Sequence, residues 1–308
     1  MLFGLVQEHL QDSFRHARES YEGPLPKYVK DEFRKYLECG DFSRGFVHVQ
    51  CPVCHEDKAV AFSCKLRGLC PSCAGRRMAG TAAHLVDRVL PAVPVRQYVL
   101  AFPYELSGLA ATRPEVLRGL SRIFWEALRR RYQRWAKRAG HATTRVETGA
   151  VTGVHRAGAS LNVHVHFHVL CLDGVYVETE AKDGTLRFEA APAPSREELQ
   201  ETLQYVYARV MKWLARRGLF READASNEAP SYSAGEAMTL AGMQRGTLET
   251  AKDTGVPAHD DLARERLCRY LARPAFSLAR VGVRRGGLVV YRVKNAGRGR
   301  VKQLVIRR

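Results

Sequence analysis

Three histidines alternate with apolar side chains in the segment LNVHVHFHVLCLDGVY, which spans residues 161–176. The segment is rich in valine and phenylalanine, which favour β-strands, and no helix-forming run interrupts it. Side chains along a strand point alternately to its two faces. We therefore expect His164, His166 and His168 to share one face, while the intervening apolar side chains share the other.

A row of three imidazoles on one face is difficult to satisfy by packing alone, because each buried ring nitrogen needs a partner. A metal ion satisfies several rings together, and neutral imidazole is the commonest metal ligand in proteins. The sequence therefore favours a metal site over a row of structural histidines. A turn at residues 156–160 predicts a hairpin that brings His155 beside the three histidines, where it is either a neighbour of the metal site or a residue of the hairpin surface.

Cysteines form a second cluster near the N-terminus. Five of the eight cysteines lie between residues 51 and 73, and they include Cys51-Pro-Val-Cys54 and Cys70-Pro-Ser-Cys73. Two such pairs at this spacing are typical of a four-cysteine structural zinc site, which we favour over a disulfide or redox pair. Neighbouring side chains are alternative ligands of this site or ligands of a second one: Cys39, His55 and Cys64.

Composition limits the class of protein. The chain has 308 residues, of which 45% are hydrophobic and 26% charged, so a globular protein with two domains is expected. The chain has no run of 18 apolar residues, so no membrane span is predicted. The first residues turn polar too early for a secretory signal. With no sign of export, the cysteines are expected to be thiols in a reducing cytoplasm.

The net charge points to a polyanionic partner. Lysine and arginine number 49 against 32 acidic residues, which gives a formal charge of +17. Nucleic acid is the first candidate and an acidic membrane surface the second. Basic residues gather in the cysteine region, near the end of a predicted helix at 113–139, and in the last 25 residues. Each group is either a solvated face or a set of phosphate contacts. The candidate DNA-binding residues are Lys65, Arg67, Arg76, Arg77, Arg269 and Arg273.

Periodicity, capping and turn signals predict the order of elements. Helices are expected at 3–20, 26–38, 82–90, 113–139, 195–217 and 262–271, the fifth beginning with the capping box Ser195-x-x-Glu198. Strands are expected at 95–102, 145–155, the histidine segment, 175–177, 186–188, 280–283 and 287–293, and residues 221–260 are predicted to be loops. This order predicts an α+β fold with an antiparallel sheet covered by helices. We expect an N-terminal helical and zinc-binding domain at 1–90 and a second domain at 91–308.

Tyr270 is a candidate nucleophile in the segment Arg269-Tyr270-Leu271-Ala272-Arg273. Nearby cations or a metal lower the pKa of a phenol from its usual value of about 10. A phenolate is both a nucleophile and a leaving group, so a phosphotyrosine bond would keep a cut strand joinable. Water is the alternative nucleophile at the histidines, and packing is the alternative role for Tyr270.

Several segments resemble a known family. The histidine segment LNVHVHFHVLCLDGVY resembles the His-hydrophobic-His motif of the HUH nucleases. In sequence it is most similar to the rolling-circle transposases of the insertion-sequence-91 family. QEHL, GFVHVQCPVC, FSCKLRGLCPSCAGRRM and HLVDRVLP resemble the zinc-binding N-terminal region of that family. RLCRYLARP resembles its tyrosine segment, and YRVK resembles the hairpin that follows. The resemblance covers most of the chain in the order of the family.

The resemblance implies a fold, an activity and particular residues. The sheet would be a palm like that of the RNA-recognition motif, His166 and His168 would hold a catalytic Mg²⁺ or Mn²⁺, and Tyr270 would be the nucleophile. Pro274 occupies the position of a second tyrosine in some relatives, which implies the single-tyrosine branch. The implied activity is nicking of one DNA strand through a 5′-phosphotyrosine, followed by transfer of that strand. The implied partners are single-stranded DNA at the element ends and at the target, with the zinc region helping to recognise the ends.

The sequence departs from the family at three places. Residues 221–260 form a shorter segment than the resemblance leads us to expect. His155 lies where relatives commonly carry the glutamine of Gln-Arg-Phe-Gly-Ser, and either residue type is a possible third ligand. The chain ends at Arg308, where relatives continue. Two alternatives therefore remain beside the transposase: an inactive, truncated relative that binds DNA through zinc and basic surfaces, and a metal-dependent phosphodiesterase that uses water and zinc.

Overall fold

The computed structural model describes residues 2–20, 23–66, 68–142, 146–178, 185–219, 247–284, 288–293 and 303–306. The chain divides into two compact units: an N-terminal unit of Met1–Gly80 with Arg273–Arg308, and a central unit of Thr81–Ala272. The division at residue 90 that we expected differs from this, because the C-terminal segment clusters with the N-terminal unit. The assignment of separate DNA-recognition and catalytic domains stays a prediction.

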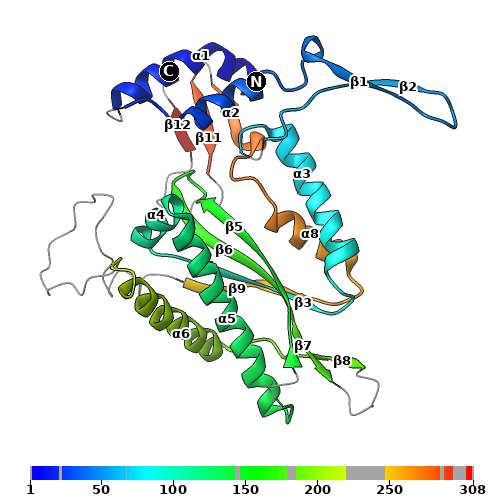
Figure 1. Ribbon diagram of the computed structural model, residues 1–308, viewed down its shortest axis with the longest axis vertical. Coiled ribbons are helices and arrows are strands. Elements are labelled where there is room, and N and C mark those ends of the chain that lie inside the picture. Colours follow the sequence, from blue (N-terminus) through cyan, green and yellow to red (C-terminus); the bar gives the residue numbers. More distant parts are fainter. Residues whose placement is uncertain are drawn as a thin grey trace, which may run out of the picture. The chain divides into compact units, whose positions relative to one another are not determined.

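A four-stranded antiparallel sheet forms the middle of the central unit (Figure 1). Its order is β5 (Ala150–Ala157), β6 (Val163–Leu172), β3 (Val95–Ala101) and β9 (Thr247–Val256). The histidine strand β6 is therefore an inner strand with partners on both sides. A second sheet of the same unit has the order β4 (Val146–Glu147), β7 (Gly174–Glu178) and β8 (Leu186–Ala190).

Strand β9 corrects a prediction, because it lies within residues 221–260, which we expected to be loops. Its sequence TLETAKDTGV mixes threonine with charged residues and has no apolar alternation. Such a strand gives little signal in the sequence, and β9 pairs on one side only, with β3. Residues 221–246 of the predicted loop lie outside the described residues, and residues 257–260 form no helix or strand.

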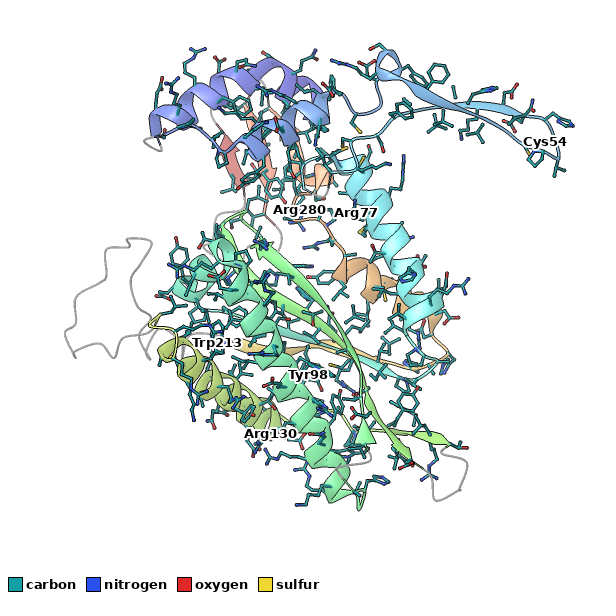
Figure 2. The ribbon with its side chains drawn as sticks, viewed as in Figure 1. Cys54, Arg77, Tyr98, Arg130, Trp213 and Arg280 are labelled. Carbon is teal, nitrogen blue, oxygen red and sulfur yellow. The ribbon has the colours of Figure 1, made fainter. Side chains whose placement is uncertain are left out.

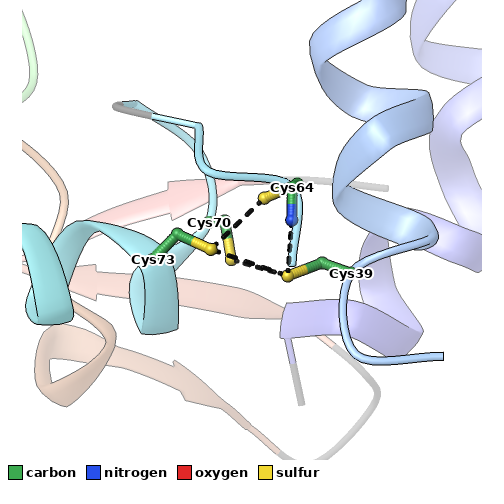
Figure 3. Close-up of side chains that lie close together, drawn as sticks. All are labelled: Cys39, Cys64, Cys70 and Cys73. Carbon is green, nitrogen blue, oxygen red and sulfur yellow. Dashed lines mark hydrogen bonds between the residues drawn. The ribbon is translucent and has the colours of Figure 1, made fainter. Parts of the chain in front are cut away.

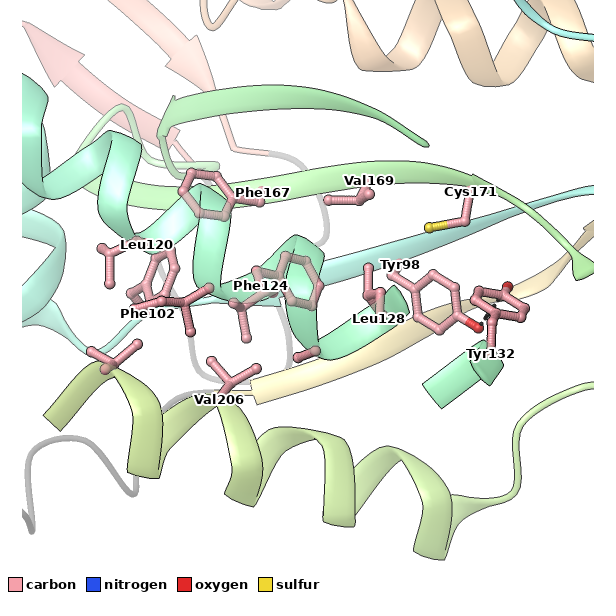
Figure 4. Close-up of a cluster of buried hydrophobic side chains, with 14 of the residues drawn as sticks. Tyr98, Phe102, Leu120, Phe124, Leu128, Tyr132, Phe167, Val169, Cys171 and Val206 are labelled. Atoms are coloured by element: carbon pink, nitrogen blue, oxygen red, sulfur yellow. Dashed lines mark hydrogen bonds between the residues drawn. The ribbon is translucent and has the colours of Figure 1, made fainter. Parts of the chain in front are cut away.

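One face of the central sheet is covered by α4 (Tyr104–Thr112), α5 (Pro114–Arg138) and α6 (Arg196–Ala215). The side chains of Phe167, Phe102, Phe124 and Val206 meet there in a large buried apolar cluster (Figure 4). The predicted cap of α6 is confirmed, because the Ser195 side chain accepts a hydrogen bond from the backbone N–H of Glu198. The sequence did not predict α4 as a separate helix.

The opposite face of the sheet carries a smaller apolar cluster, which includes Leu85, Leu170, Cys268 and Leu271. These side chains come from η2 (Leu85–Val89), from β6 and from α8 (Asp261–Leu271). Leu170 lies on the same strand as the histidines and, by the alternation of side chains, on the same face. The sequence therefore predicted the two faces of β6 correctly: one is wholly apolar, and the other is part imidazole and part apolar.

The N-terminal unit begins with α1 (Leu2–Ser20) and α2 (Lys27–Leu37). The short turn η1 (Phe42–Arg44), the hairpin strands β1 (Phe46–Gln50) and β2 (Asp57–Ala61), and α3 (Pro71–His84) follow, although the last residues of α3 belong to the central unit. Beyond η4 (Leu278–Arg280), the C-terminal segment adds a three-stranded antiparallel sheet of β10 (Val281–Val283), β11 (Val289–Arg292) and β12 (Gln303–Ile306). Strand β12 lies in the basic tail, where no strand was predicted.

The expected α+β class is confirmed, with antiparallel sheets, covering helices and an N-terminal cysteine-rich region. Among the described residues, no helix is long and apolar enough to cross a membrane.

Phe167 tests the apolar face of β6, because its side chain is fully buried. The centroid of its ring lies 5.0 Å from that of Phe102 and 6.4 Å from that of Phe124. We expect Phe167→Ala to lower the free energy of unfolding by about 3–5 kcal/mol, because it removes packed surface and leaves a cavity. Val163→Ala on the same strand is the control, since Val163 is 49% exposed, and we expect a change within about 0.5 kcal/mol. Urea denaturation measures both, and equal losses would contradict the burial of Phe167 in the apolar cluster.

Candidate metal centres

Four cysteines of the N-terminal unit form a compact cluster: Cys39, Cys64, Cys70 and Cys73 (Figure 3). The Sγ atom of Cys73 lies 3.7 Å from that of Cys39 and 3.6 Å from that of Cys64, and the Sγ atoms of Cys39 and Cys70 are 3.6 Å apart. Zn–S bonds of about 2.3 Å at tetrahedral angles require sulfur atoms about 3.8 Å apart. The cluster therefore matches the edges of a zinc tetrahedron.

The electrostatics of the cluster also favour a cation between the four sulfur atoms. Burial raises the pKa of Cys64 and Cys70, whereas for Cys73 the effect of burial is outweighed by hydrogen bonds from Cys64 and from the backbone of Lys65, which lower its pKa to about 7. Four thiols this close cannot all ionise next to one another without a cation. A divalent ion provides that charge, so the donor set fits a structural zinc.

The cluster corrects the predicted pairing of the cysteines. Cys70 and Cys73 join Cys39 and Cys64, which we had named as substitutes, rather than Cys51 and Cys54. The physical reason is the hairpin β1–β2, which carries the first pair to its own turn, away from the segment ends. A backbone hydrogen bond from Gly40 to Phe62 closes that hairpin at its base and brings Cys39 and Cys64 together. Spacing alone did not reveal this closure.

Three histidines of the central unit form a second group: His155, His166 and His168, whose ligand atoms lie within 4.8 Å of one another. His155 on β5 is directly opposite His166 on β6, so both side chains leave the sheet on the same face. The ring centroids of His155 and His168 are 4.3 Å apart, and those of His166 and His168 are 5.0 Å apart. The predicted hairpin thus places His155 beside the strand histidines.

Hydrogen bonds orient each of these rings. Nδ1 of His166 is 2.9 Å from the carbonyl oxygen of His164, so it carries the proton, and the lone pair is on Nε2. Nδ1 of His168 is 3.0 Å from the side-chain amide of Gln97, and Nε2 of His155 is 3.2 Å from the carbonyl oxygen of Leu271. His155 and His166 each donate a ring N–H to a carbonyl oxygen, as metal-binding histidines commonly do, which fixes the tautomer and the ring plane. The Gln97 amide nitrogen is a donor, so binding of a metal through Nε2 of His168 would require this amide to be turned so that its oxygen accepts from Nδ1.

His164 lies outside this group, although we had included it among the candidate ligands. Its ring centroid is 5.2 Å from that of His166, on the same face and nearer the start of the strand. Burial lowers the pKa of His164, which keeps its ring neutral over a wider pH range.

Tyr270 lies next to the histidine group. Its ring centroid is 5.0 Å from that of His168 and 5.9 Å from that of His155. The two segments are about a hundred residues apart in sequence, and helix α8 brings them together. The candidate nucleophile and the candidate metal ligands therefore share one site within the central unit.

Two residues that the sequence analysis missed place α8 against the sheet. Gly153 on β5 has no side chain where the carbonyl oxygen of Leu271 approaches, since a Cβ there would be 2.7 Å from that oxygen. Arg264 is 2% exposed, and its guanidinium donates to the carbonyl oxygens of Leu90, Pro91 and Val93. A glycine within a run of β-branched residues was the available signal for the first, because it often marks close backbone approach.

The candidate DNA-binding residues are spread over both units. Lys65, Arg76 and Arg77 are exposed in the N-terminal unit, where Arg77 donates to the backbone carbonyl of Lys65. Arg269 is exposed and forms an ion pair with Glu265, and Arg273 is half-buried. Arg67 lies outside the described residues.

The basic end of α5 is less available for phosphates than its sequence indicated. Its arginines face acidic residues of neighbouring elements: Arg129 pairs with Glu147, Arg131 and Arg138 with Glu198, and Arg134 with Glu201. Arg131 is also buried against the ring of Tyr132. These pairs join α5 to α6 and β4, so much of this charge is structural.

Two family models match the chain. A model described as "Transposase zinc-binding domain", of the insertion-sequence-91 type, matches residues 6–102, and one described as "Putative transposase" matches residues 149–308. The chain belongs to the insertion-sequence-91 family of transposases. No curated protein and no solved structure matches the chain.

Family membership assigns the transposase a DNA substrate and an N-terminal zinc-binding domain. All four clustered cysteines lie within the residues that the zinc-binding model matches. The match and the cluster geometry together support a structural zinc ion. The histidines and Tyr270 lie within the second match.

The observed cysteine cluster and the pairing expected from spacing predict different effects of single cysteine substitutions. We expect Cys39→Ser to lose tightly held zinc and to abolish hydrogen-exchange protection of α2 and of the start of α3, because this site replaces a large core. Cys54→Ser should keep that protection, since Cys54 lies in the hairpin turn. Hydrogen exchange followed by mass spectrometry measures both. Loss of protection in Cys54→Ser with retention in Cys39→Ser would support the pairing expected from spacing.

Proposed function

We propose that this transposase nicks single-stranded DNA with Tyr270 as the nucleophile and joins the cut strand to a new site. The observation that carries the proposal is the position of the Tyr270 ring, 5.0 Å from His168 and 5.9 Å from His155 by ring centroids. A phenol next to three imidazoles brings a nucleophile and a metal-binding group to one phosphodiester.

His155, His166 and His168 would hold the divalent ion. The donor set fits this role, because the three ligand atoms lie within 4.8 Å and each ring is oriented by a partner. When bound, a divalent ion supplies Lewis-acid withdrawal of charge from a phosphate oxygen. Imidazole is a softer ligand than Mg²⁺ prefers, so Mn²⁺ is expected to support activity at least as well as Mg²⁺.

The chain's own groups account for the strand chemistry. The Tyr270 oxygen attacks phosphorus and loses its proton to solvent, and the 3′-oxygen of the preceding nucleotide leaves and takes up a proton. The 5′-phosphotyrosine conserves the phosphodiester energy, so a new 3′-hydroxyl can reverse the step and release Tyr270. Arg269 and Arg273 flank Tyr270 in sequence and supply positive charge for the phosphate.

Tyr270→Phe tests the nucleophile. We expect wild-type protein incubated with Mn²⁺ and a labelled single-stranded oligonucleotide to form a covalent adduct that survives a denaturing gel, and Tyr270→Phe to form none. Tyr205→Phe is the matched control, because Tyr205 lies on α6, which covers the other face of the sheet, under the guanidinium of Arg130. It should form the adduct as the wild type does.

The same gel separates the alternatives. Cleaved oligonucleotide without any adduct would indicate a phosphodiesterase that uses water. Binding with neither cleavage nor adduct would indicate a DNA-binding relative. Either result in the wild type would contradict the proposal.

His166→Ala tests the role of the histidine group. We expect adduct formation to fall by about 100-fold or more, because a ligand and its oriented ring nitrogen are lost. Affinity for single-stranded DNA and its dependence on salt concentration should stay near the wild-type values, since phosphate contacts come from basic residues. Fluorescence anisotropy at several salt concentrations measures the binding. An equal loss of binding and adduct would mean that the histidines are structural.

A further inference from the structure

Cys51 and Cys54 remain without a role, because the cysteine cluster does not include them. They lie in the turn of the hairpin β1–β2, and Cys54 is exposed at its outer end (Figure 2). Both strands of this hairpin are exposed nearly throughout. An isolated two-stranded ribbon is only marginally stable in water, so an additional stabilising partner is expected for it.

The turn is built to present two sulfur atoms together. The backbone N–H of Cys51 donates to the carbonyl of Glu56, and the N–H of His55 donates to the carbonyl of Cys51, each at 2.9 Å. His55 adopts a left-handed conformation with φ 56°, which turns the chain sharply after Cys54. A turn that carries a C-x-x-C pair supplies two of the four thiolates of a structural zinc site. This is half of a tetrahedral thiolate site.

The described part of the chain does not complete that half. The groups of three or more ligand atoms found there are the cysteine cluster and the histidine group, and neither contains Cys51 or Cys54. Two other hairpin side chains that could donate to a metal are paired with each other, since Nε2 of His48 is 3.2 Å from the carboxylate of Asp57. A four-coordinate ion at this turn therefore needs two ligands from elsewhere.

The hairpin surface favours a protein partner over DNA. Glu56 and Asp57 adjoin the turn, and Lys58 is the single lysine or arginine from Phe46 to Phe62, so the ribbon has no basic surface for phosphates. One of its faces exposes three valines, which are 40–50% accessible: Val47, Val49 and Val60. Exposed apolar side chains on a ribbon are typical of a protein contact.

We propose that two copies of the transposase join through these hairpin turns and share one zinc ion, held by Cys51 and Cys54 of each copy. A second copy supplies the two missing sulfurs in the same geometry, and the valine faces of the two ribbons give it apolar contact. The four thiols release their protons to solvent as the divalent ion binds, and no oxidant is needed. The proposal does not depend on Tyr270 or on the histidines.

The full-length chain tests this by its mass in light scattering after size exclusion, with zinc content measured on the same fractions. With zinc present, we expect the wild type at twice the chain mass of 34.6 kDa and the double variant Cys51→Ser/Cys54→Ser at that mass itself. The wild type should hold half a zinc ion per chain more than the double variant. An ion at the histidines would be present in both proteins and would not affect this difference. Hydrogen-exchange protection of α2 equal to that of the wild type shows that the cysteine cluster of the variant is still folded.

Other outcomes overturn the proposal. A wild-type monomer that still holds a full extra ion per chain would mean that the site closes within one chain, and its loss in His55→Ala or His48→Ala would name the ligand. A dimer that persists in a chelator but separates in a reductant would be a disulfide. Unchanged mass with weaker DNA binding in the double variant would make the ribbon a DNA contact.

Discussion

The two-sided burial of β6 is the constraint on which the rest of the central unit depends. From His166 to Cys171 the strand is paired on both sides, so its two faces differ only in their side chains. Phe167 and its apolar neighbours anchor the strand against α4, α5 and α6, which fixes the register. Because a slip of one residue would exchange the two faces, the same packing that stabilises the fold also sets His166 opposite His155, with His168 on the same face.

Local patterns in the sequence predicted most of this region. They did not predict the contacts between segments that are distant in the sequence. Alternation along β6 was strong enough to place the histidines on one face, and a turn signal was strong enough to bring in His155. In contrast, β9 carries no apolar alternation and forms only because β3 offers it an edge. The basic end of α5 was misjudged for a related reason: charge in the sequence does not show that Glu198 and Glu201 lie opposite on α6.

The cysteine region shows the limit of spacing as evidence. Two C-x-x-C pairs at the expected separation predicted one site, yet the structure separates them because a hairpin lies between them. Cys39 and Cys64, each outside a pair, complete the tetrahedron once the ends of that hairpin meet. A pair at the turn and a pair at a helix start thus have different surroundings: Cys70 and Cys73 are buried, whereas Cys54 is exposed to solvent. The burial of the cysteines, rather than the C-x-x-C motif that both pairs share, thus distinguishes the site that stabilises one chain from the site that we propose is shared with a second copy.

The placement of Tyr270 follows from how α8 is held, and not from its local sequence. The Arg264 guanidinium binds three carbonyl oxygens between Leu90 and Val93, at the end of η2, so α8 is fixed to the segment that leads into β3. Without Arg264, these buried carbonyls would lose their donor at a cost of about 1–3 kcal/mol each. A lysine cannot replace it, since an ammonium lacks the planar spread of donors that reaches all three. This contact, together with the close approach of the Leu271 carbonyl oxygen to Gly153, places the end of α8 next to the histidines. The position of Tyr270 beside the histidines therefore depends on the contacts of Arg264 and Leu271, which hold α8 on either side of it in the sequence.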